Sequence, residues 1–125
     1  MVKFFYEPYY TELITSNPLP FNPNINKDLI KQILLEFVDT LNLDVPEQIW
    51  FGSLKELGTK YNFANNAKEY KKNPTIYNGH IGDVAEMIRI ALTSSKQSPN
   101  LYYILRILGN KEVSRRIKKV IELIK

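Results

Sequence analysis

Apolar residues after position 23 recur every three or four positions, the spacing that places side chains on one face of an α-helix. The first stripe follows Asn24 and Asn26, either of which can act as the N-cap, and comprises Ile30, Ile33, Leu34, Phe37, Val38 and Leu41. The second helix begins at Pro46, a residue favoured in the first turn, and carries Trp50, Leu54, Leu57 and Tyr61. Gly58 is a candidate for its end.

The middle of the chain predicts a short helix, a loop and a long helix. Phe63, Ala64 and Ala67 suit a short helix within residues 62–72, which Asn73-Pro74 would stop. Residues 75–83 form the main internal loop. The helix after it has an apolar stripe of Ile81, Val84, Ala85, Ile88, Ala91 and Leu92.

Residues 98–125 predict two helices joined by a tight turn. Ser98 and Pro99 suit the N-terminus of the first of these two helices, whose apolar stripe comprises Leu101, Ile104, Leu105 and Leu108. Gly109 suits a left-handed helix end, and Asn110 can cap the second helix, whose stripe is Val113, Ile117, Val120, Ile121 and Ile124. The connection is shorter than that of a DNA-binding helix-turn-helix, so we predict an antiparallel hairpin.

Residues 1–23 differ from the rest because aromatic residues and prolines crowd together. Val2–Tyr6 and Tyr10–Ile14 could pair as a short β-hairpin around Glu7-Pro8. This many aromatic rings exposed to water would form a large apolar patch. The arm therefore packs on its own domain or docks into a partner, and the candidate partner-binding residues are Phe4, Phe5, Tyr6, Tyr9 and Tyr10.

Together these patterns predict an all-α fold. We expect a small bundle of four to six helices in residues 24–125, preceded by an extended aromatic and proline-rich arm in residues 1–23. The expected core includes Ile33, Phe37, Leu41, Trp50, Leu54, Val84, Ile88, Leu105, Ile117 and Ile121.

Composition excludes several classes of site. The chain has 125 residues, no cysteine and a single histidine, so disulfides, thiolate catalysis and two-histidine metal sites are excluded, and we predict no metal and no cofactor. No apolar run reaches membrane-spanning length and no signal peptide is evident. We therefore expect no membrane contact and a cytoplasmic or virion-associated location.

Charge is divided unevenly along the chain. Residues 1–62 hold five Lys against eight Asp and Glu, whereas residues 63–125 hold twelve Lys and Arg against five Asp and Glu. A basic half indicates an anionic partner or self-association. The candidate nucleic-acid-binding residues are Lys68, Lys71, Lys72, Arg106, Lys111, Arg115, Arg116, Lys118 and Lys119.

The loop Gly79–Asp83 is the one candidate for chemistry. Glycines before a helix can admit an anion, but the spacing matches neither a Walker A motif nor a dinucleotide fingerprint. His80 and Asp83 could act as a base with its orienting carboxylate, yet no nucleophile lies nearby in the sequence. We favour a turn with a capping Asp and predict no catalytic residue.

These features favour a non-enzymatic accessory or structural protein that binds DNA or RNA phosphates without sequence preference. Tyrosines interleaved with cations, as in Tyr70-Lys71-Lys72 and in Tyr102-Tyr103 with Arg106, also suit single-stranded nucleic acid. The first alternative is a protein-interaction subunit of a larger nucleoprotein or viral assembly, or of an oligomer of this chain, held through the aromatic arm. The second is an enzyme that acts on phosphate esters at the Gly79–Asp83 loop.

Overall fold

The structure, a computed structural model, describes residues 19, 21–94 and 100–124. These residues form five helices and two short strands: α2 (Lys27–Thr40), α3 (Glu47–Lys60), β1 (Phe63–Ala64), α4 (Ala67–Lys72), β2 (Gly79–His80), α5 (Ile81–Thr93) and α6 (Leu101–Leu123). The predicted all-α class is confirmed. The predicted arm and its residues Phe4, Phe5, Tyr6, Tyr9 and Tyr10 lie outside the described residues.

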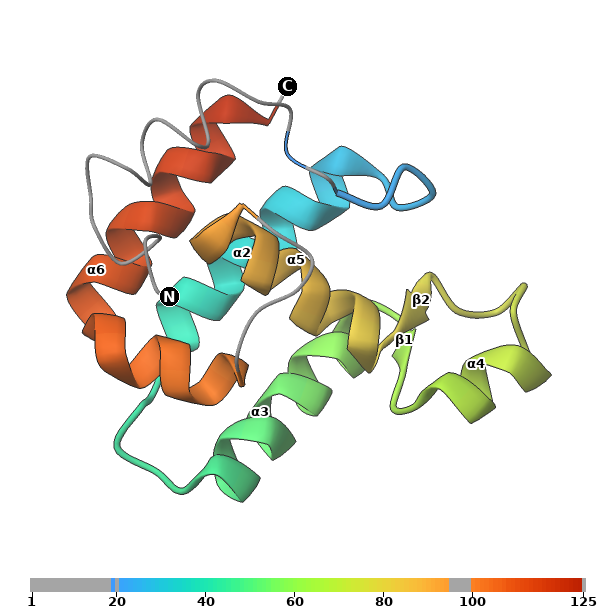
Figure 1. Cartoon of the computed structure of the whole chain (residues 1–125). Coiled ribbons are helices and arrows are strands. Elements are labelled where there is room, and N and C mark those ends of the chain that lie inside the picture. The colour runs from blue at the N-terminus through green and yellow to red at the C-terminus, as the bar shows by residue number, and fades with distance from the viewer. Residues whose placement is uncertain (1–18, 20, 95–99, 125) are drawn as a thin grey trace.

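The central helices are α2 and α5, with α6 along one side and α3 along another (Figure 1). Helix α2 begins at Asn26, whose side chain accepts a hydrogen bond from the Asp28 amide at 2.7 Å. It contacts α3, α5 and α6, as a central helix requires. Eight of the ten predicted core residues are buried, and the other two, Leu41 and Ile121, are half-buried against the core.

A small lobe projects from this bundle between α3 and α5 (Figure 1). Strands β1 and β2 pair in parallel, with Phe63 opposite Gly79 and Ala64 opposite His80, and α4 connects them. Asn66 caps α4 by accepting a hydrogen bond from the Glu69 amide at 2.7 Å. We call residues 62–80 the α4 lobe.

The structure differs from the sequence prediction at both strands of the lobe and at the end of α3. Phe63 and Ala64, expected in a short helix, form β1, and Gly79 and His80, expected in the loop of residues 75–83, form β2, because a two-residue strand is too short to show a period. Gly58 does not end α3, which continues to Lys60; the glycine is buried where α3 packs on Phe63 and Val84.

His80 and Asp83 form a capping box at the start of α5. The Gly82 amide donates to His80 Nδ1 at 3.0 Å, and the His80 amide donates to Asp83 Oδ2 at 2.9 Å. Both side chains therefore satisfy amides that the first helical turn would leave unbonded. The predicted capping turn is confirmed.

Replacing His80 with alanine should lower the free energy of unfolding by about 1 kcal/mol, because the cap acceptor is lost. His80→Asn keeps an acceptor at this position but removes the ring that packs on Tyr70, at 5.8 Å between centroids. Urea unfolding followed by circular dichroism should place His80→Asn between wild type and His80→Ala. Equal losses in both variants would show that the ring contact, and not the cap, matters.

Helix α6 is broken at Gly109, whose φ of 82° and ψ of 160° are not helical. Positive φ favours glycine, so the predicted break is confirmed. Figure 1 shows the two halves of α6 as the arms of an open bend, and the predicted antiparallel hairpin is wrong. The helix starts after Asn100, whose side chain accepts from the Tyr102 amide at 2.9 Å; the predicted cap Ser98 and Pro99 lie outside the described residues.

A polar contact ties α2 to the end of α3. Glu36 Oε1 accepts hydrogen bonds from Lys60 Nζ and from the Tyr61 hydroxyl, both at 2.8 Å. The Lys60 hydrogen bond, followed by that of Tyr61, holds the pKa of the Glu36 carboxyl below its ordinary value. The same contact raises the pKa of both Lys60 and Tyr61. The charged form of Glu36 thus favours the folded state.

Glu36→Gln should weaken the acid sensitivity of the fold. A carboxyl whose folded pKa is depressed stabilises the fold above its unfolded pKa, here about 4.5, and this stabilisation disappears as the pH falls through the folded pKa. The wild-type urea midpoint should therefore fall more steeply than that of Glu36→Gln as the pH drops from 5 to 3, a range set by that pKa. Parallel curves for the two proteins would contradict this role.

Within the described residues, none of the helices has the length and apolar character needed to cross a membrane.

Candidate nucleic-acid interface

Three cations share one exposed face in the second half of α6. Lys111, Arg115 and Lys118 are spaced by four and three residues, which aligns them on a helix, and all three are exposed. We call them the α6 stripe. Lys119, also predicted to bind nucleic acid, lies next to this face and is half-buried. The stripe offers a row of positive charge that could follow a phosphate backbone.

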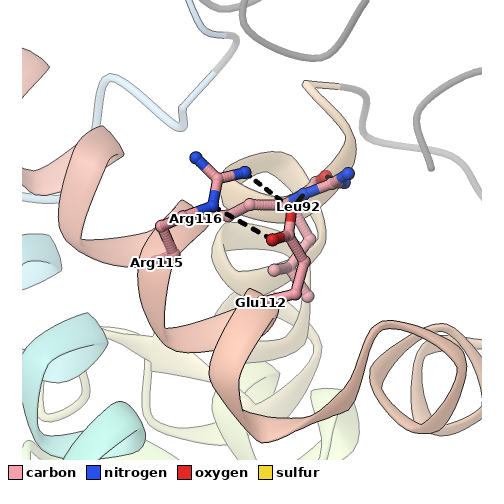
Figure 2. A network of polar contacts seen from close by, with 4 residues as sticks. All are labelled: Leu92, Glu112, Arg115 and Arg116. Atoms are coloured by element: carbon pink, nitrogen blue, oxygen red, sulfur yellow. Dashed lines mark hydrogen bonds and ion pairs between the residues drawn. The ribbon is translucent and has the colours of Figure 1, made fainter. Parts of the chain in front are cut away.

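Arg116 does not belong to this surface, although the sequence predicted it there. Its side chain is fully buried, because the apolar stripe of α6 turns it toward the end of α5. Arg116 Nε donates to Glu112 Oε2 at 2.7 Å, and Nη1 donates to the Leu92 carbonyl oxygen at 3.1 Å (Figure 2). A buried guanidinium cannot contact RNA or DNA, so this predicted binding residue is corrected to a structural one.

Glu112 accepts from two arginines at once. Arg115 Nη2 donates to Glu112 Oε2 at 2.7 Å and Arg115 Nε to Oε1 at 3.0 Å, in addition to the bond from Arg116 (Figure 2). The carboxylate therefore offsets part of the positive charge of the α6 stripe. The two lysines of the stripe lie one on each side of this cluster along the helix.

A second set of exposed cations lies on the α4 lobe. Lys68, Lys71 and Lys72 are spaced by three and one residues, which places them on neighbouring positions of the short helix. We call them the α4 stripe. Behind them, the Tyr77 hydroxyl donates to Glu69 Oε1 at 3.3 Å, and burial, with the Glu69 carboxylate beside it, raises the pKa of Tyr77. The lobe thus presents lysines on a surface fixed by its own polar contacts.

The predicted cations do not form one continuous surface. Figure 1 shows α4 and α6 on opposite sides of the bundle, so the lysines of α4 do not extend the basic face of α6. The sequence could not reveal this, because both segments belong to the same basic half of the chain. A nucleic acid that touched both stripes would have to span the helical body between them.

Four aromatic rings connect α3 to the start of α6. The centroid distances are 6.4 Å from Phe51 to Trp50, 5.6 Å from Trp50 to Tyr102 and 6.0 Å from Tyr102 to Tyr103. The inner pair, Trp50 and Tyr102, is buried, whereas 37% of Phe51 and 58% of Tyr103 are exposed.

On each of the two helices, one ring has a cation over it. Lys55 Nζ lies 5.0 Å from the centre of the Phe51 ring, and the Arg106 guanidinium lies 5.7 Å from the centre of the Tyr102 ring. Arg106 Nη1 also donates to the Tyr102 hydroxyl at 3.2 Å. We call Phe51, Lys55, Tyr103 and Arg106 the ring surface. The sequence analysis identified Tyr103 and Arg106 but missed Phe51 and Lys55 of α3. The signal that could have identified them was Phe51, an aromatic residue just outside the apolar stripe of that helix.

The remaining candidates have other roles. His80 and Asp83 are occupied in capping α5, which leaves neither side chain poised as the general base proposed for the Gly79–Asp83 loop. No group of three or more His, Asp or Glu side chains suited to a metal ion occurs in the described part of the chain.

Comparison with known families identifies a match over half of this chain. Residues 59–121 match a family described as the anticodon binding domain. The matched segment runs from the end of α3 through the α4 lobe and α5 into the last turn of α6, so it contains both stripes. No solved structure matches the chain.

Curated relatives extend the similarity to nearly the whole chain. Proteins named glutamate–tRNA ligase are 32% identical over 120 residues in Acetivibrio thermocellus, 34% over 124 residues in Clostridium perfringens and 35% over 121 residues in Clostridium beijerinckii. The alignments cover 96–97% of this chain but only 21–22% of each relative. The chain thus spans about a fifth of the length of the curated relatives it matches.

These comparisons correct the predicted function. A non-enzymatic accessory or structural protein is contradicted, because the relatives are ligases and the matched segment is a nucleic-acid-binding part of such enzymes. The coarser prediction of a helical domain that binds nucleic acid is confirmed. The predicted accessory subunit, oligomer, protein-interaction role and virion association find no support in the comparisons.

Proposed function

Because this chain belongs to the anticodon binding domain family, we propose that it is the part of a glutamate–tRNA ligase that holds the anticodon arm of the tRNA. The observation that carries this proposal is the agreement between the family match and the ligases aligned over 96–97% of the chain. We assign the RNA contact to this chain. The ligation step is not assigned to it, because the alignments cover about a fifth of each ligase.

The exposed cations are the proposed phosphate contacts, together with the half-buried Lys119 beside them. The exposed ones are Lys111, Arg115 and Lys118 on α6, Arg106 before the bend, and Lys68, Lys71 and Lys72 on the α4 lobe. Phosphate contacts position an RNA and carry no sequence information by themselves. Recognition of a particular anticodon therefore needs further contacts to unpaired bases, which is how proteins usually read RNA sequence.

Footprinting on a complete glutamate tRNA tests the proposal. The 125-residue chain should protect nucleotides of the anticodon loop and its stem from cleavage, and it should leave the acceptor end accessible. Protection should weaken as salt rises, since phosphate contacts release counterions. Protection of the acceptor end alone, or no protection even at low salt, would contradict the proposed function.

The predicted division into an arm of residues 1–23 and a helical domain of residues 24–125 stays a prediction, because most of the arm lies outside the described residues. The cytoplasmic location expected from the sequence likewise stays a prediction.

A further inference from the structure

The exposed rings at the junction of α3 and α6 stand out because nothing in the fold requires them to reach solvent. Trp50 and Tyr102 already fill the contact between the two helices, and the Tyr102 hydroxyl donates to the Val45 carbonyl oxygen. Tyr103, next to Tyr102 in the chain, is 58% exposed, and Ile107, four residues later on the same face, is 67% exposed. This face of α6 therefore exposes two large apolar side chains where the surface of a helix is usually polar.

The cations next to these rings indicate the chemistry of the occupant. Arg106 follows Tyr103 by three residues, so both lie on one face of α6, and Lys55 lies over the Phe51 ring on α3. If the partner were the apolar surface of another protein, we would expect this face to carry no positive charge. Rings accompanied by cations suit a ligand with flat aromatic groups and a negative backbone, which is single-stranded nucleic acid.

We propose that the ring surface stacks unpaired nucleotides of the bound RNA, with Tyr103 as the principal platform and Phe51 as a second one. Arg106 and Lys55 would then neutralise the phosphates of the stacked nucleotides. This inference rests on the proposed function and deepens it, because it assigns the contacts to bases that the two lysine-rich stripes do not supply.

The position of the surface supports this assignment. Tyr103 and Arg106 lie on the first half of α6, and the α6 stripe lies on the second half, beyond the bend at Gly109. An RNA whose backbone followed the second half would bring the adjoining nucleotides toward the first half. Paired nucleotides keep their faces covered by their neighbours, so only a loop could use the rings.

Two RNA probes separate base stacking from phosphate binding. The first is a hairpin with a seven-nucleotide unpaired loop that carries 2-aminopurine, as in an anticodon arm, and the second is a duplex of equal charge without unpaired nucleotides. Tyr103→Ala should reduce affinity for the hairpin by about tenfold, within the range for one base stacked on an aromatic ring, and should leave affinity for the duplex unchanged. The salt dependence of binding should also stay the same, because no phosphate contact is lost.

The control variants keep the fold and separate the ring from its surroundings. Tyr103→Phe retains the ring and should bind the hairpin like wild type, with the same quenching of 2-aminopurine. Phe51→Ala should lose affinity to a smaller extent. Ile49→Ala removes another exposed apolar side chain, 58% exposed and about 200° around α3 from Phe51, and should change nothing.

The outcomes distinguish failure of the stacking role from failure of the RNA-binding function. If wild type binds the hairpin and Tyr103→Ala binds it equally well, the stacking role is overturned while the RNA-binding function stands; the rings would then belong to a contact with another protein surface. Equal losses for the hairpin and the duplex would also overturn stacking. If wild type binds neither RNA, the proposed function fails and the stacking role fails with it.

Discussion

Replacing Arg116 with alanine should lower the free energy of unfolding by about 2–5 kcal/mol, the range for truncating a large buried side chain, and the loss of its hydrogen bonds places the cost toward the upper end. The side chain is fully buried. Its bond to the Leu92 carbonyl oxygen joins α6 to the last turn of α5, and its bond to Glu112 lies within α6. The variant loses both bonds and leaves the volume of a large side chain unfilled. Urea unfolding followed by circular dichroism measures the change.

Arg115 provides the matched control, because it is bonded to the same carboxylate. Its side chain is 42% exposed, and exposed ion pairs contribute about 1 kcal/mol or less. Arg115→Ala should therefore cost far less than Arg116→Ala. Arg116→Met should lie between them, since it fills most of the volume but, like Arg116→Ala, loses the bonds to Glu112 and to the Leu92 carbonyl oxygen. Similar losses for Arg115→Ala and Arg116→Ala would contradict the structural role of Arg116.

Reversing two lysines of either stripe should reduce affinity for the anticodon hairpin by about 25-fold or more at about 0.1 M salt, which is the counterion-release effect of two lost phosphate contacts. The two variants are Lys111→Glu with Lys118→Glu on α6 and Lys68→Glu with Lys72→Glu on the α4 lobe. Both pairs are exposed, so the fold should not change. The slope of log affinity against log salt should fall by about 1.4 in each variant.

A double variant on α2 controls for net charge. Lys27→Glu with Lys31→Glu makes the same change in charge on a helix outside the matched segment, and it should lower affinity by less than about threefold. Losses as large as those of the stripe variants would mean that overall charge, and not the two surfaces, binds the RNA. A loss in only one stripe variant would confine the phosphate contacts to that stripe.

The helices could be predicted because their apolar stripes and end signals agree with the tertiary packing. The cap at Asn26, one of two predicted candidates, and the break at Gly109 appear where the sequence placed them, and α3 begins at Glu47, one residue after the predicted start at Pro46. These are local signals, each set by a few neighbouring residues. The pairing of β1 with β2 could not be predicted in the same way, because it joins residues far apart in sequence through segments too short to show a period.

The site was harder to predict than the fold, and Arg116 shows why. Sequence spacing places Arg115 and Arg116 beside each other in a basic run, and a charged side chain is usually exposed. Glu112, four residues earlier on the same helix, could pair with Arg116 by local spacing, but the Leu92 carbonyl oxygen reaches Arg116 only through the packing of α5 on α6. The separation of α4 from α6 is likewise a property of the fold and not of any local pattern.

The function was mispredicted for a related reason. Positive charge and tyrosines correctly indicated nucleic acid, but composition cannot distinguish an independent binding protein from the binding part of an enzyme. That distinction came from the similarity to glutamate–tRNA ligases.

The measurement that tests recognition of the anticodon arm most directly is a competition between two hairpins with the same stem. One carries the anticodon loop of a glutamate tRNA, and the other carries a loop of equal length and unrelated sequence. Binding of the first should be at least about tenfold tighter, since hydrogen bonds to the edge of a matching base discriminate against a wrong base by about 1–3 kcal/mol, whereas stacking and phosphate contacts do not depend on sequence. Equal affinity for the two hairpins, or binding to neither at low salt, would contradict the account.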